Sequence, residues 1–376
     1  MQKVISIVGT RPEIIRTSRI LPKLDKYCKH LIVHTNQNFS KNLKDIFYEE
    51  LELRQPDIVL ETSSGSNWND PSHTNVRGLG QQLADMLPKI EEVLRKEQPD
   101  KVFILGDTNS ALCSIIAERM GIPVYHMESA NRSYDKRIPE EVNRRLIDAI
   151  SSYNLFYTPL NRHTLLSEGF SPKTIFQCGN PTAEILDYYK DKIDNSDVLE
   201  RLGIVYPEAG YVSYCLADFH RTENVDDPER LQELIRGVNL LGEKLNREVI
   251  CSIHPRTQSK LEKMDVKLHE NVRFLDAMGY FDFVKLEKFA DVILTDSGLV
   301  SEEACILGCP CVIIRDTTER PEAVECGSAM ISGVNAERMV EATNVMFGKK
   351  NWIIPEGWQE LNVSDRVVQY ILGERQ

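Results

Sequence analysis

Three carboxylates stand close behind apolar runs of the sequence and could carry out acid–base chemistry. Asp107 comes shortly after the run KVFIL, Glu128 directly follows VYHM, and Glu140 lies in the segment PEEVNRR. If these runs are parallel strands, the carboxylates meet beyond the carboxyl ends of one sheet, where ligands bind. Several carboxylates at one place could remove and return protons. A structural alternative remains for two of them, because Asp107 could cap a helix and Glu140 could pair with Arg144 four residues later.

Arginines and expected helix starts form a second set, which is suited to a diphosphate. Arg11 and Arg16 follow the first apolar run, KVISIV, and Arg320 lies in the polar segment RDTTERPE after a later run. Ser297 and Gly298 follow the run VILT at the expected start of a helix, where backbone N–H groups and a hydroxyl bind phosphate well. The first of these loops is neither a dinucleotide fingerprint nor a Walker loop, so a plain turn with surface arginines is its alternative.

The second half of the chain adds histidines and a glutamate at similar positions. His220 and Arg221 follow the run YVSYCL, and His254 ends the next apolar run. A lone histidine is more often structural than functional, and a loop in solvent explains His254 equally well. Glu303, or its neighbour Glu302, is placed to accept hydrogen bonds from ribose hydroxyls, although glutamates in a first helical turn also complement the helix dipole.

Short apolar runs alternate with amphipathic stretches along the chain, which predicts an α/β fold with parallel sheets flanked by helices. The predicted strands of a first sheet are Lys3–Val8, Leu31–His34, Lys101–Leu105, Val124–His126, Asn154–Tyr157 and Thr174–Gln177. Those of a second sheet are Tyr211–Leu216, Val249–Ser252, Val272–Leu275, Val292–Leu294 and Cys311–Ile314. The sequence therefore predicts two Rossmann-like halves.

The length of 376 residues suggests two domains at roughly 150 residues per domain. We expect an N-terminal Rossmann-like domain over 1–186, a polar connection over 187–208 and a C-terminal Rossmann-like domain over 209–360. A final helix within 361–376 should pack back on the N-terminal domain. The N-terminal domain would carry the catalytic carboxylates, and the C-terminal domain would carry the nucleotide-binding loops.

Composition excludes several classes of partner. The 57 acidic residues exceed the 45 basic ones, so the net charge of −12 argues against nucleic acid and against an anionic membrane surface. No apolar run approaches the roughly 20 residues of a membrane span, and the first residues do not resemble a signal peptide, so we expect a cytoplasmic protein. The nine cysteines contain no CxxC pair and the eight histidines no HExxH pattern, so we expect free thiols and no metal.

Taken together, the motifs strongly resemble the non-hydrolysing UDP-N-acetylglucosamine 2-epimerase family from Val4 to about Gly333. Six ordered groups carry the resemblance: GTRPE, GDTNS, HMES with PEEVNR, HRTENV, TDSG with SEEA, and RDTTERPEA. The resemblance implies two Rossmann-like domains in an arrangement like that of the GT-B glycosyltransferases, with a UDP-sugar in the interdomain cleft. It also implies a homodimer that requires neither a cofactor nor a metal.

The resemblance assigns roles to single residues. Its catalytic positions are Asp107, Glu128, Glu140 and His220. Its substrate-binding positions, with the adjoining polar residues that we add to them, are Arg11, Arg16, Arg144, Arg221, His254, Ser297, Gly298, Glu303 and Arg320. The four residues Arg11, Arg16, Arg144 and Arg320 would hold phosphate or promote loss of UDP, Ser297 would contact the diphosphate, and Glu303 would bind ribose.

The implied reaction converts UDP-N-acetylglucosamine to UDP-N-acetylmannosamine by elimination of UDP and its re-addition with inversion at C2. Alternatives are the same chemistry on a 6-deoxy or uronate UDP-2-acetamido sugar, a hydrolysing epimerase, a GT-B glycosyltransferase, and a nucleotide-sugar binding protein without activity. Two departures from the family pattern stand out: Ala130 replaces a glycine after Glu128, and the family's HTGQH pattern appears as His34-Thr35-Asn36-Gln37-Asn38. Some members use the latter region to bind an activating UDP-sugar, and we do not expect that regulation here.

Overall fold

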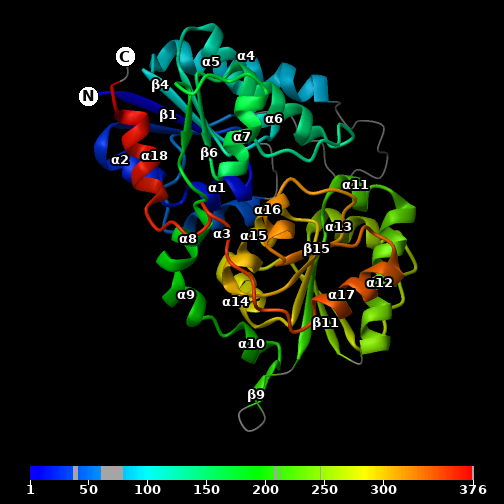
Figure 1. The fold of residues 1–376 in the computed structure, drawn as a ribbon. Helices are drawn as coiled ribbons and strands as arrows, with labels where there is room; N and C mark the ends of the chain where they lie inside the picture. The colour runs from blue at the N-terminus through cyan, green and yellow to red at the C-terminus, as the bar shows by residue number, and fades with distance from the viewer. Residues whose placement is uncertain (37–40, 61–78, 207–209, 212, 246, 375–376) are drawn as a thin grey trace. The chain divides into compact units, whose positions relative to one another are not determined.

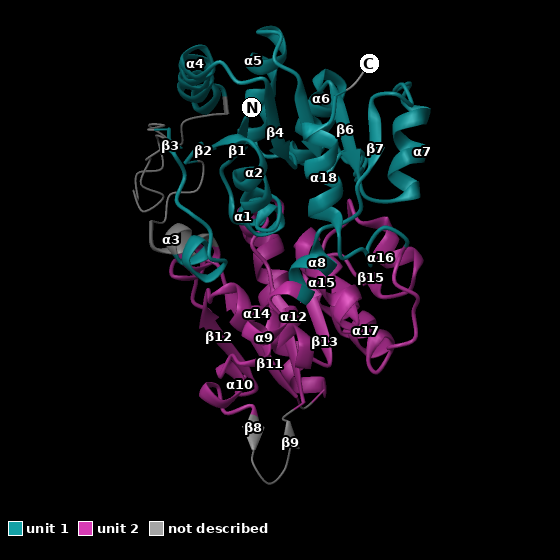
Figure 2. Ribbon diagram, turned by 90° about the vertical axis from the view of Figure 1, so that its left-hand side faces the viewer, with its two compact units in different colours: residues 1–187, 356–376 teal, residues 188–355 magenta. Residues whose placement is uncertain are grey.

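The computed structural model describes the chain except for residues 37–40, 61–78, 207–209, 212, 246 and 375–376. It contains two compact units, residues 1–187 with 356–376 (unit 1) and residues 188–355 (unit 2), which Figure 2 shows in two colours. Gln37 and Asn38 of the HTNQN segment lie outside the described residues. So do residues 207 and 208 of the predicted connection and residue 212 of one predicted strand.

Unit 1 is built on a parallel sheet of seven strands in the order β3-β2-β1-β4-β5-β6-β7. Its strands are β1 (Lys3–Val8), β2 (Lys29–His34), β3 (Ile58–Val59), β4 (Lys101–Leu105), β5 (Val124–Met127), β6 (Tyr153–Phe156) and β7 (Ile175–Gln177). The strands are nearly continuous apolar runs because helices cover both faces of the sheet. The strand order changes direction between β1 and β4, and ligands bind beyond the carboxyl ends of strands at such a switch point.

The helices of unit 1 include one that comes from the far end of the chain. They are α1 (Arg11–Thr17), α2 (Leu21–Tyr27), α3 (Lys41–Glu50), α4 (Leu79–Glu97), η1 (Asn109–Cys113), α5 (Ser114–Arg119), α6 (Pro139–Ile150), α7 (Pro159–Ser167), α8 (Thr182–Tyr188) and α18 (Val363–Leu372). Helix α18 buries Val363, Val367 and Ile371 in one apolar cluster with Phe103 of β4 and Leu24 of α2. Figure 1 shows α18 beside α2, so the last helix completes the core of the unit that holds the first strand.

Unit 2 repeats the architecture with a parallel sheet of six strands in the order β12-β11-β10-β13-β14-β15. Its strands are β10 (Tyr214–Asp218), β11 (Glu248–Ile253), β12 (Val272–Asp276), β13 (Val292–Thr295), β14 (Cys311–Ile313) and β15 (Ala329–Ile331). Its helices are α9 (Lys190–Asp194), α10 (Val198–Arg201), α11 (Thr222–Val225), α12 (Pro228–Leu245), α13 (Pro255–Leu261), α14 (Tyr280–Phe289), α15 (Gly298–Leu307), α16 (Pro321–Glu325) and α17 (Ala336–Met346). The switch point lies between β10 and β13.

The prediction of two Rossmann-like parallel sheets is confirmed. Two short edge strands, β3 and β15, were not predicted. The segment 187–208, which the sequence suggests is a connection, contains α9, α10 and the strand β8 (Val205–Tyr206), which pairs with β9 (Gly210–Tyr211) in an antiparallel ribbon.

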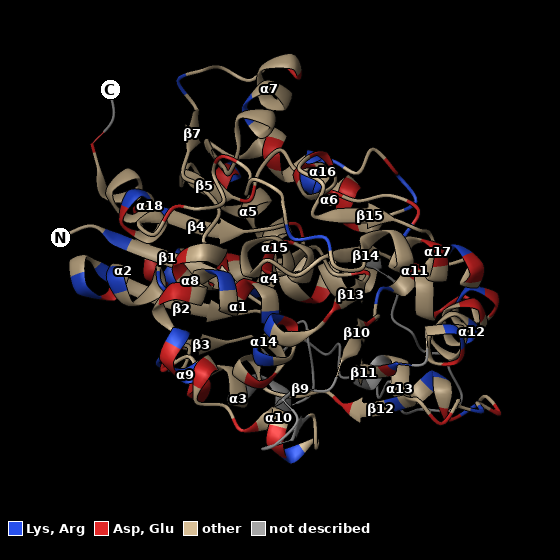
Figure 3. Cartoon of the chain, turned by 60° about the horizontal axis from the view of Figure 1, so that its bottom comes forward, with Lys and Arg blue, Asp and Glu red and all other residues tan. Residues whose placement is uncertain are grey.

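Charged residues of both signs are interspersed on the helices. Figure 3 shows acidic and basic residues side by side on α12, where Arg236 Nε lies 2.8 Å from Glu233 Oε1. Although the chain as a whole is acidic, acidic and basic side chains on this helix therefore form local ion pairs. Within the part of the chain that the structure describes, we find no helix that is both long enough and apolar enough to cross a membrane.

Candidate active site

Glu13 joins the two loops at the switch point of unit 1. Its carboxylate accepts hydrogen bonds from the backbone N–H groups of Gly9 at 2.5 Å and Thr10 at 3.1 Å, and from the Thr108 hydroxyl at 2.5 Å. The side chain is buried, and burial raises the pKa of Glu13 to about 7. Glu13 therefore ties the loop after β1 to the loop after β4. Glu13 belongs to the GTRPE motif, but the sequence alone indicates no role for it.

Two of the three predicted catalytic carboxylates lie at this same edge, each beside an arginine. Asp107 forms an ion pair with Arg144, and Glu128 Oε2 lies 3.2 Å from Arg16 Nη1. A Cβ atom at Gly106, next to Asp107, would lie 3.6 Å from Glu128 Oε2, so Glu128 reaches the turn that carries Asp107. The cations balance the carboxylate charges in a largely buried setting, since the side chains of Arg16 and Arg144 are each only 3% exposed.

Glu140 and Arg11 occupy the first turns of α6 and α1. Glu140 follows Pro139 and is half-buried, whereas Glu141, which was not among the predicted site residues, is completely buried. Glu141 accepts hydrogen bonds from the Ser133 backbone N–H at 2.9 Å and from Arg144 Nη1 at 3.2 Å. Arg144 thus contacts Glu141 three residues before it as well as Asp107. The guanidinium of Arg11 lies over the Phe47 ring, 5.6 Å from its centroid.

The loop after Glu128 follows a left-handed path and is anchored by a buried aspartate. Glu128 has a φ of 74° and Ala130 a φ of 69°, so the residue that replaces the family's glycine keeps a conformation that favours glycine. Asp148 Oδ2 accepts a hydrogen bond from the Ala130 N–H at 3.1 Å and lies 2.7 Å from Arg132 Nη2. Burial alone would raise the pKa of Asp148, but His126 and Arg132 hold it below its ordinary value. Arg132 is therefore part of the scaffold.

In unit 2, Asp296 organises the loop after β10. Its carboxylate accepts hydrogen bonds from the backbone N–H groups of His220 at 3.1 Å and Arg221 at 3.0 Å. It also accepts one from Asn224 Nδ2 at 2.9 Å. Asp296 is 1% exposed, and burial raises the pKa of its carboxyl group above the ordinary value. Asp296 follows β13, and the loop that it fixes follows β10. Asp296 therefore connects the two sides of the switch point.

His220 is surrounded by acids. Its Nδ1 lies 3.4 Å from Asp218 Oδ2 and 3.6 Å from Asp296 Oδ1, and its ring centroid is 5.7 Å from that of His254. Burial alone would lower the pKa of His220, but the charges of Asp218 and Asp296 raise it above the ordinary value. The site therefore favours the imidazolium. Among the described residues, Asp218, His220 and Asp296 are also the group whose potential metal-ligand atoms lie within 4.8 Å of one another.

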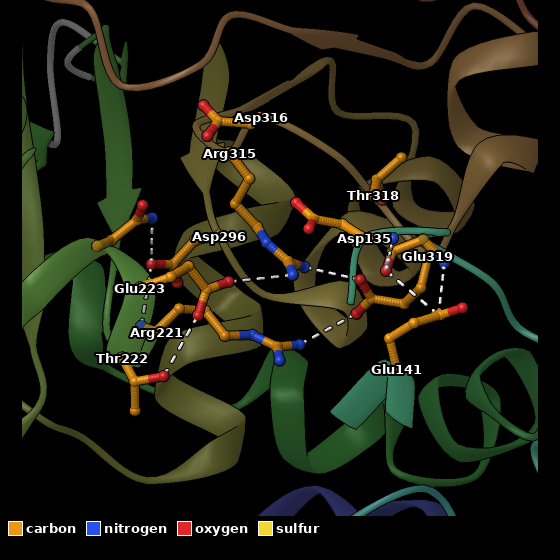
Figure 4. A network of polar contacts seen from close by, with 12 residues as sticks. Asp135, Glu141, Arg221, Thr222, Glu223, Asp296, Arg315, Asp316, Thr318 and Glu319 are labelled. Atoms are coloured by element: carbon orange, nitrogen blue, oxygen red, sulfur yellow. Dashed lines mark hydrogen bonds and ion pairs between the residues drawn. The ribbon is translucent and has the colours of Figure 1, made fainter. Parts of the chain in front are cut away.

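Glu319 connects two arginines that follow different strands of unit 2. Figure 4 shows the guanidinium groups of Arg221 and Arg315 directed at its carboxylate, with Arg221 Nη2 3.0 Å from Oε1 and Arg315 Nη1 2.7 Å from Oε2. Arg315 also lies 3.1 Å from Glu223 Oε1. A Cβ atom at Gly298 would lie only 2.8 Å from Glu319 Oε1, so the carboxylate covers the backbone at the start of α15.

Helix α15 and its N-cap carry three of the predicted residues, Ser297, Gly298 and Glu303. The hydroxyl of Ser297 caps the helix by accepting a hydrogen bond from the Val300 N–H at 3.5 Å. Glu302 forms an ion pair with Arg320, which precedes α16. Glu303 is 1% exposed and accepts a hydrogen bond from the Tyr280 hydroxyl at 2.8 Å. The structure thus brings His220, Arg221, Ser297, Gly298 and Arg320 to the carboxyl edge of the sheet of unit 2.

The sequence and the fold of this chain are similar to those of a known class of enzymes that act on nucleotide sugars. A family model described as UDP-N-acetylglucosamine 2-epimerase matches residues 23–371. UDP-N-acetylglucosamine 2-epimerase of Methanocaldococcus jannaschii is 40% identical over 363 residues, which cover 94% of this chain and 95% of that protein. The chain therefore belongs to the UDP-N-acetylglucosamine 2-epimerase family, whose named members are isomerases.

Solved structures agree with this relationship. The crystal structure of the Methanocaldococcus jannaschii epimerase in complex with UDP-GlcNAc and UDP matches with a TM-score of 0.89 and 38% identity over 98% of this chain and 99% of that one. The glycosyltransferase SnogD from Streptomyces nogalater matches with a TM-score of 0.54 and 14% identity over 99% of this chain and 95% of that one, which is a likeness of fold alone. The predicted family and the GT-B-like fold class are both confirmed.

The contact between Asp218 and His220 gives a direct test of the electrostatics. Replacement of Asp218 by asparagine removes one of the two negative charges that stabilise the imidazolium, so the pKa of His220 should fall. NMR titration of the imidazole resonances should therefore show that His220 loses its proton at lower pH in Asp218→Asn than in the wild type. Asp316→Asn removes an exposed carboxylate that pairs with Arg230 and should leave the titration unchanged. An unchanged His220 titration in Asp218→Asn would contradict the assignment.

Proposed function

We propose that this chain converts UDP-N-acetylglucosamine to UDP-N-acetylmannosamine. The observation that carries the proposal is the match to an epimerase of that name over nearly the whole of both chains. The likeness to an epimerase crystallised with UDP-GlcNAc and UDP supports the same substrate. These relatives do not favour the glycosyltransferase or hydrolysing alternatives, and the epimerase reaction accounts for a site that combines carboxylates with arginines.

The groups of unit 2 are suited to hold UDP and to stabilise its departure. Loss of UDP places developing negative charge on the diphosphate, which cations and helix N-termini stabilise in advance. We assign the diphosphate to Ser297, Gly298 and Arg320 at the starts of α15 and α16, with Arg221 beside them. His220, favoured as the imidazolium by Asp218 and Asp296, would add positive charge. His254 is a further substrate contact in this proposal, and Glu303 would accept hydrogen bonds from ribose hydroxyls.

The groups of unit 1 are suited to move the C2 proton. Inversion at C2 requires removal of the proton from one face and its return to the other, so at least two acid–base groups, or movement of the intermediate, are needed. Asp107 and Glu128 lie at one turn, and Glu140 stands in the first turn of α6. We therefore assign proton transfer to Asp107, Glu128 and Glu140. Arg11, Arg16 and Arg144 would attract the departing diphosphate, and two of them already contact the carboxylates.

Incubation of the purified protein with UDP-N-acetylglucosamine in D2O should exchange the C2 proton for deuterium. Proton NMR should show UDP-N-acetylmannosamine with the nucleotide linkage retained, because UDP adds back to the intermediate. Release of free N-acetylmannosamine and UDP would instead identify a hydrolysing enzyme. Absence of exchange on UDP-N-acetylglucosamine and on its 6-deoxy and uronate counterparts would rule out the epimerase function.

Asp107→Asn and Glu128→Gln should each lower kcat by at least ~100-fold, which is the usual contribution of a general acid or base. UDP binding measured by calorimetry should change little, because most of the proposed UDP contacts come from unit 2 and the arginines of unit 1 are retained in both variants. Glu92→Gln makes the same chemical change at an exposed position of α4 and should keep wild-type activity. A near-wild-type kcat in either active-site variant would remove that residue from the catalytic set.

We also propose that the protein is a homodimer. In a single chain, Val142 and Leu146 lie four residues apart on α6 and are 49% and 43% exposed, and nearby Tyr134 is 69% exposed. Apolar side chains that gather on one helix face favour burial against a partner. A second copy of the chain is the partner that the family resemblance implies.

Sedimentation velocity should therefore give a dimer for the wild type and a monomer for the double variant Val142→Glu, Leu146→Glu, because two charges at the centre of the face oppose its burial. Val345→Glu places one charge at a residue that is equally exposed, on α17, and should remain dimeric. A monomeric wild type, or a double variant that sediments as the dimer, would count against this interface.

The cytoplasm is the compartment that we propose for the protein. All nine cysteines are free thiols, and eight of them are buried. Thiols persist in reducing compartments, whereas oxidising ones favour disulfides. The scattered positions of the cysteines and their odd number support this assignment.

A further inference from the structure

Helices α14 and α15 pack together and bury two carboxylic acids that approach each other. Glu287 of α14 is 0% exposed, and Glu303 of α15 is 1% exposed. Glu303 is the residue to which the proposed function assigns the ribose. Glu287 has no role in that proposal, and burial of its carboxylate as an unpaired charge would be strongly unfavourable.

The hydrogen bonds around the two acids define where a proton must be. Neither carboxyl oxygen of Glu287 accepts a hydrogen bond from a donor in the described chain, and the charged group that acts on Glu287 most strongly is the carboxylate of Glu303. Two carboxyl groups can share a hydrogen bond only when one of them is protonated. Glu303 Oε1 accepts a hydrogen bond from the Tyr280 hydroxyl at 2.8 Å, and this hydrogen bond favours the ionised form of Glu303. Glu287 is therefore the partner that holds the proton.

The charges around Glu287 lead to the same conclusion. The titratable groups that interact with it, within the described residues, are all acids: Glu303 of α15, Tyr280 of α14, Asp218 and Tyr214 of β10, and Cys309 and Cys311 around the start of β14. No cation among them would stabilise an ionised Glu287. Burial and the charges of Glu303 and Asp218 raise the pKa of Glu287 well above its ordinary value.

We propose that Glu287 is a positioning residue that donates a hydrogen bond to Glu303 and fixes the Glu303 carboxylate for a vicinal diol of the ligand. This inference rests on the proposed function, which assigns the ribose of UDP to Glu303. An ionised carboxylate has about four acceptor sites. Tyr280 donates to one of them, and a proton on Glu287 would donate to another, so that the carboxylate is held in one orientation for the 2′- and 3′-hydroxyl groups. Ribose recognition thus depends on the proton that Glu287 holds.

Calorimetric binding of UDP and of 2′-deoxy-UDP tests this role without relying on catalysis. In Glu287→Leu, which has no donor, the dissociation constant for UDP should rise at least tenfold, and the preference for UDP over 2′-deoxy-UDP should largely disappear. Glu287→Gln keeps an N–H donor that cannot ionise and should bind UDP within threefold of the wild type. A general loss of structure would weaken the binding of UDP and of 2′-deoxy-UDP to the same extent. Circular dichroism would detect such a loss of structure.

The pH dependence separates the wild type from Glu287→Gln, even if the leucine variant does not fold. As pH rises, the wild type loses the Glu287 proton and the two carboxylates repel each other, so UDP binding should weaken. The glutamine variant lacks that step, and its affinity should stay flatter over the same alkaline range. Ionisation of the uracil ring affects both proteins equally.

Identical pH dependence in the wild type and in Glu287→Gln would overturn the inference. An unchanged preference for UDP over 2′-deoxy-UDP in a folded Glu287→Leu would also overturn it. Either result could occur in an active epimerase, in which case this inference alone fails. If the wild-type protein bound no UDP, the assignment of Glu303 and the role of Glu287 would both be wrong. Binding that follows these expectations without epimerisation would refute the proposed reaction and leave the role of Glu287 in place.

Discussion

Hydrogen bonds from loop backbone amides to buried carboxylates fix the functional groups of each unit. Asp296 accepts the N–H groups of His220 and Arg221, and Glu13 accepts those of Gly9 and Thr10. Removal of a carboxylate from water costs several kcal/mol, which charge-assisted hydrogen bonds offset only when their geometry is good. The loops therefore have little freedom to rearrange, because any other path would leave both the carboxylate and the amides unsatisfied. The side chains that we propose for catalysis and binding are therefore positioned by these bonds.

A second layer of order comes from ion pairs among the functional residues themselves. Arg144 contacts Asp107, Arg16 lies near Glu128, and Arg320 contacts Glu302. These arginines are nearly buried and keep their charge in almost any environment, so each needs a carboxylate nearby. The overall charge of −12 gives no indication of this arrangement. What matters for an anionic ligand is the local field at the strand ends.

The fold could largely be predicted because buried parallel strands are continuous apolar runs, and ligands bind beyond their carboxyl ends. The loops that carry Asp107, His220 and Ser297 follow directly from that rule. The partners of each residue could not be predicted in the same way. Glu13 and Glu287 look like ordinary polar residues of amphipathic helices. The partner Thr108 of Glu13 lies 95 residues away in the sequence, and the burial of Glu287 depends on the packing of α14 against α15. The strand β3 has only two residues, Ile58 and Val59, which is too few for a periodic signal.

The carboxylate of Glu319 places a negative charge of the protein itself at the start of α15. Its carboxylate covers Gly298 and accepts hydrogen bonds from Arg221 and Arg315. It therefore acts as an internal mimic of an anionic ligand. An anion that binds at this helix start would have to displace the Glu319 carboxylate from Gly298. Arg221 and Arg315 would then exchange one negatively charged partner for another. The free energy of binding then reflects the difference between two anions, so the presence of arginines at this helix start does not by itself imply very tight binding.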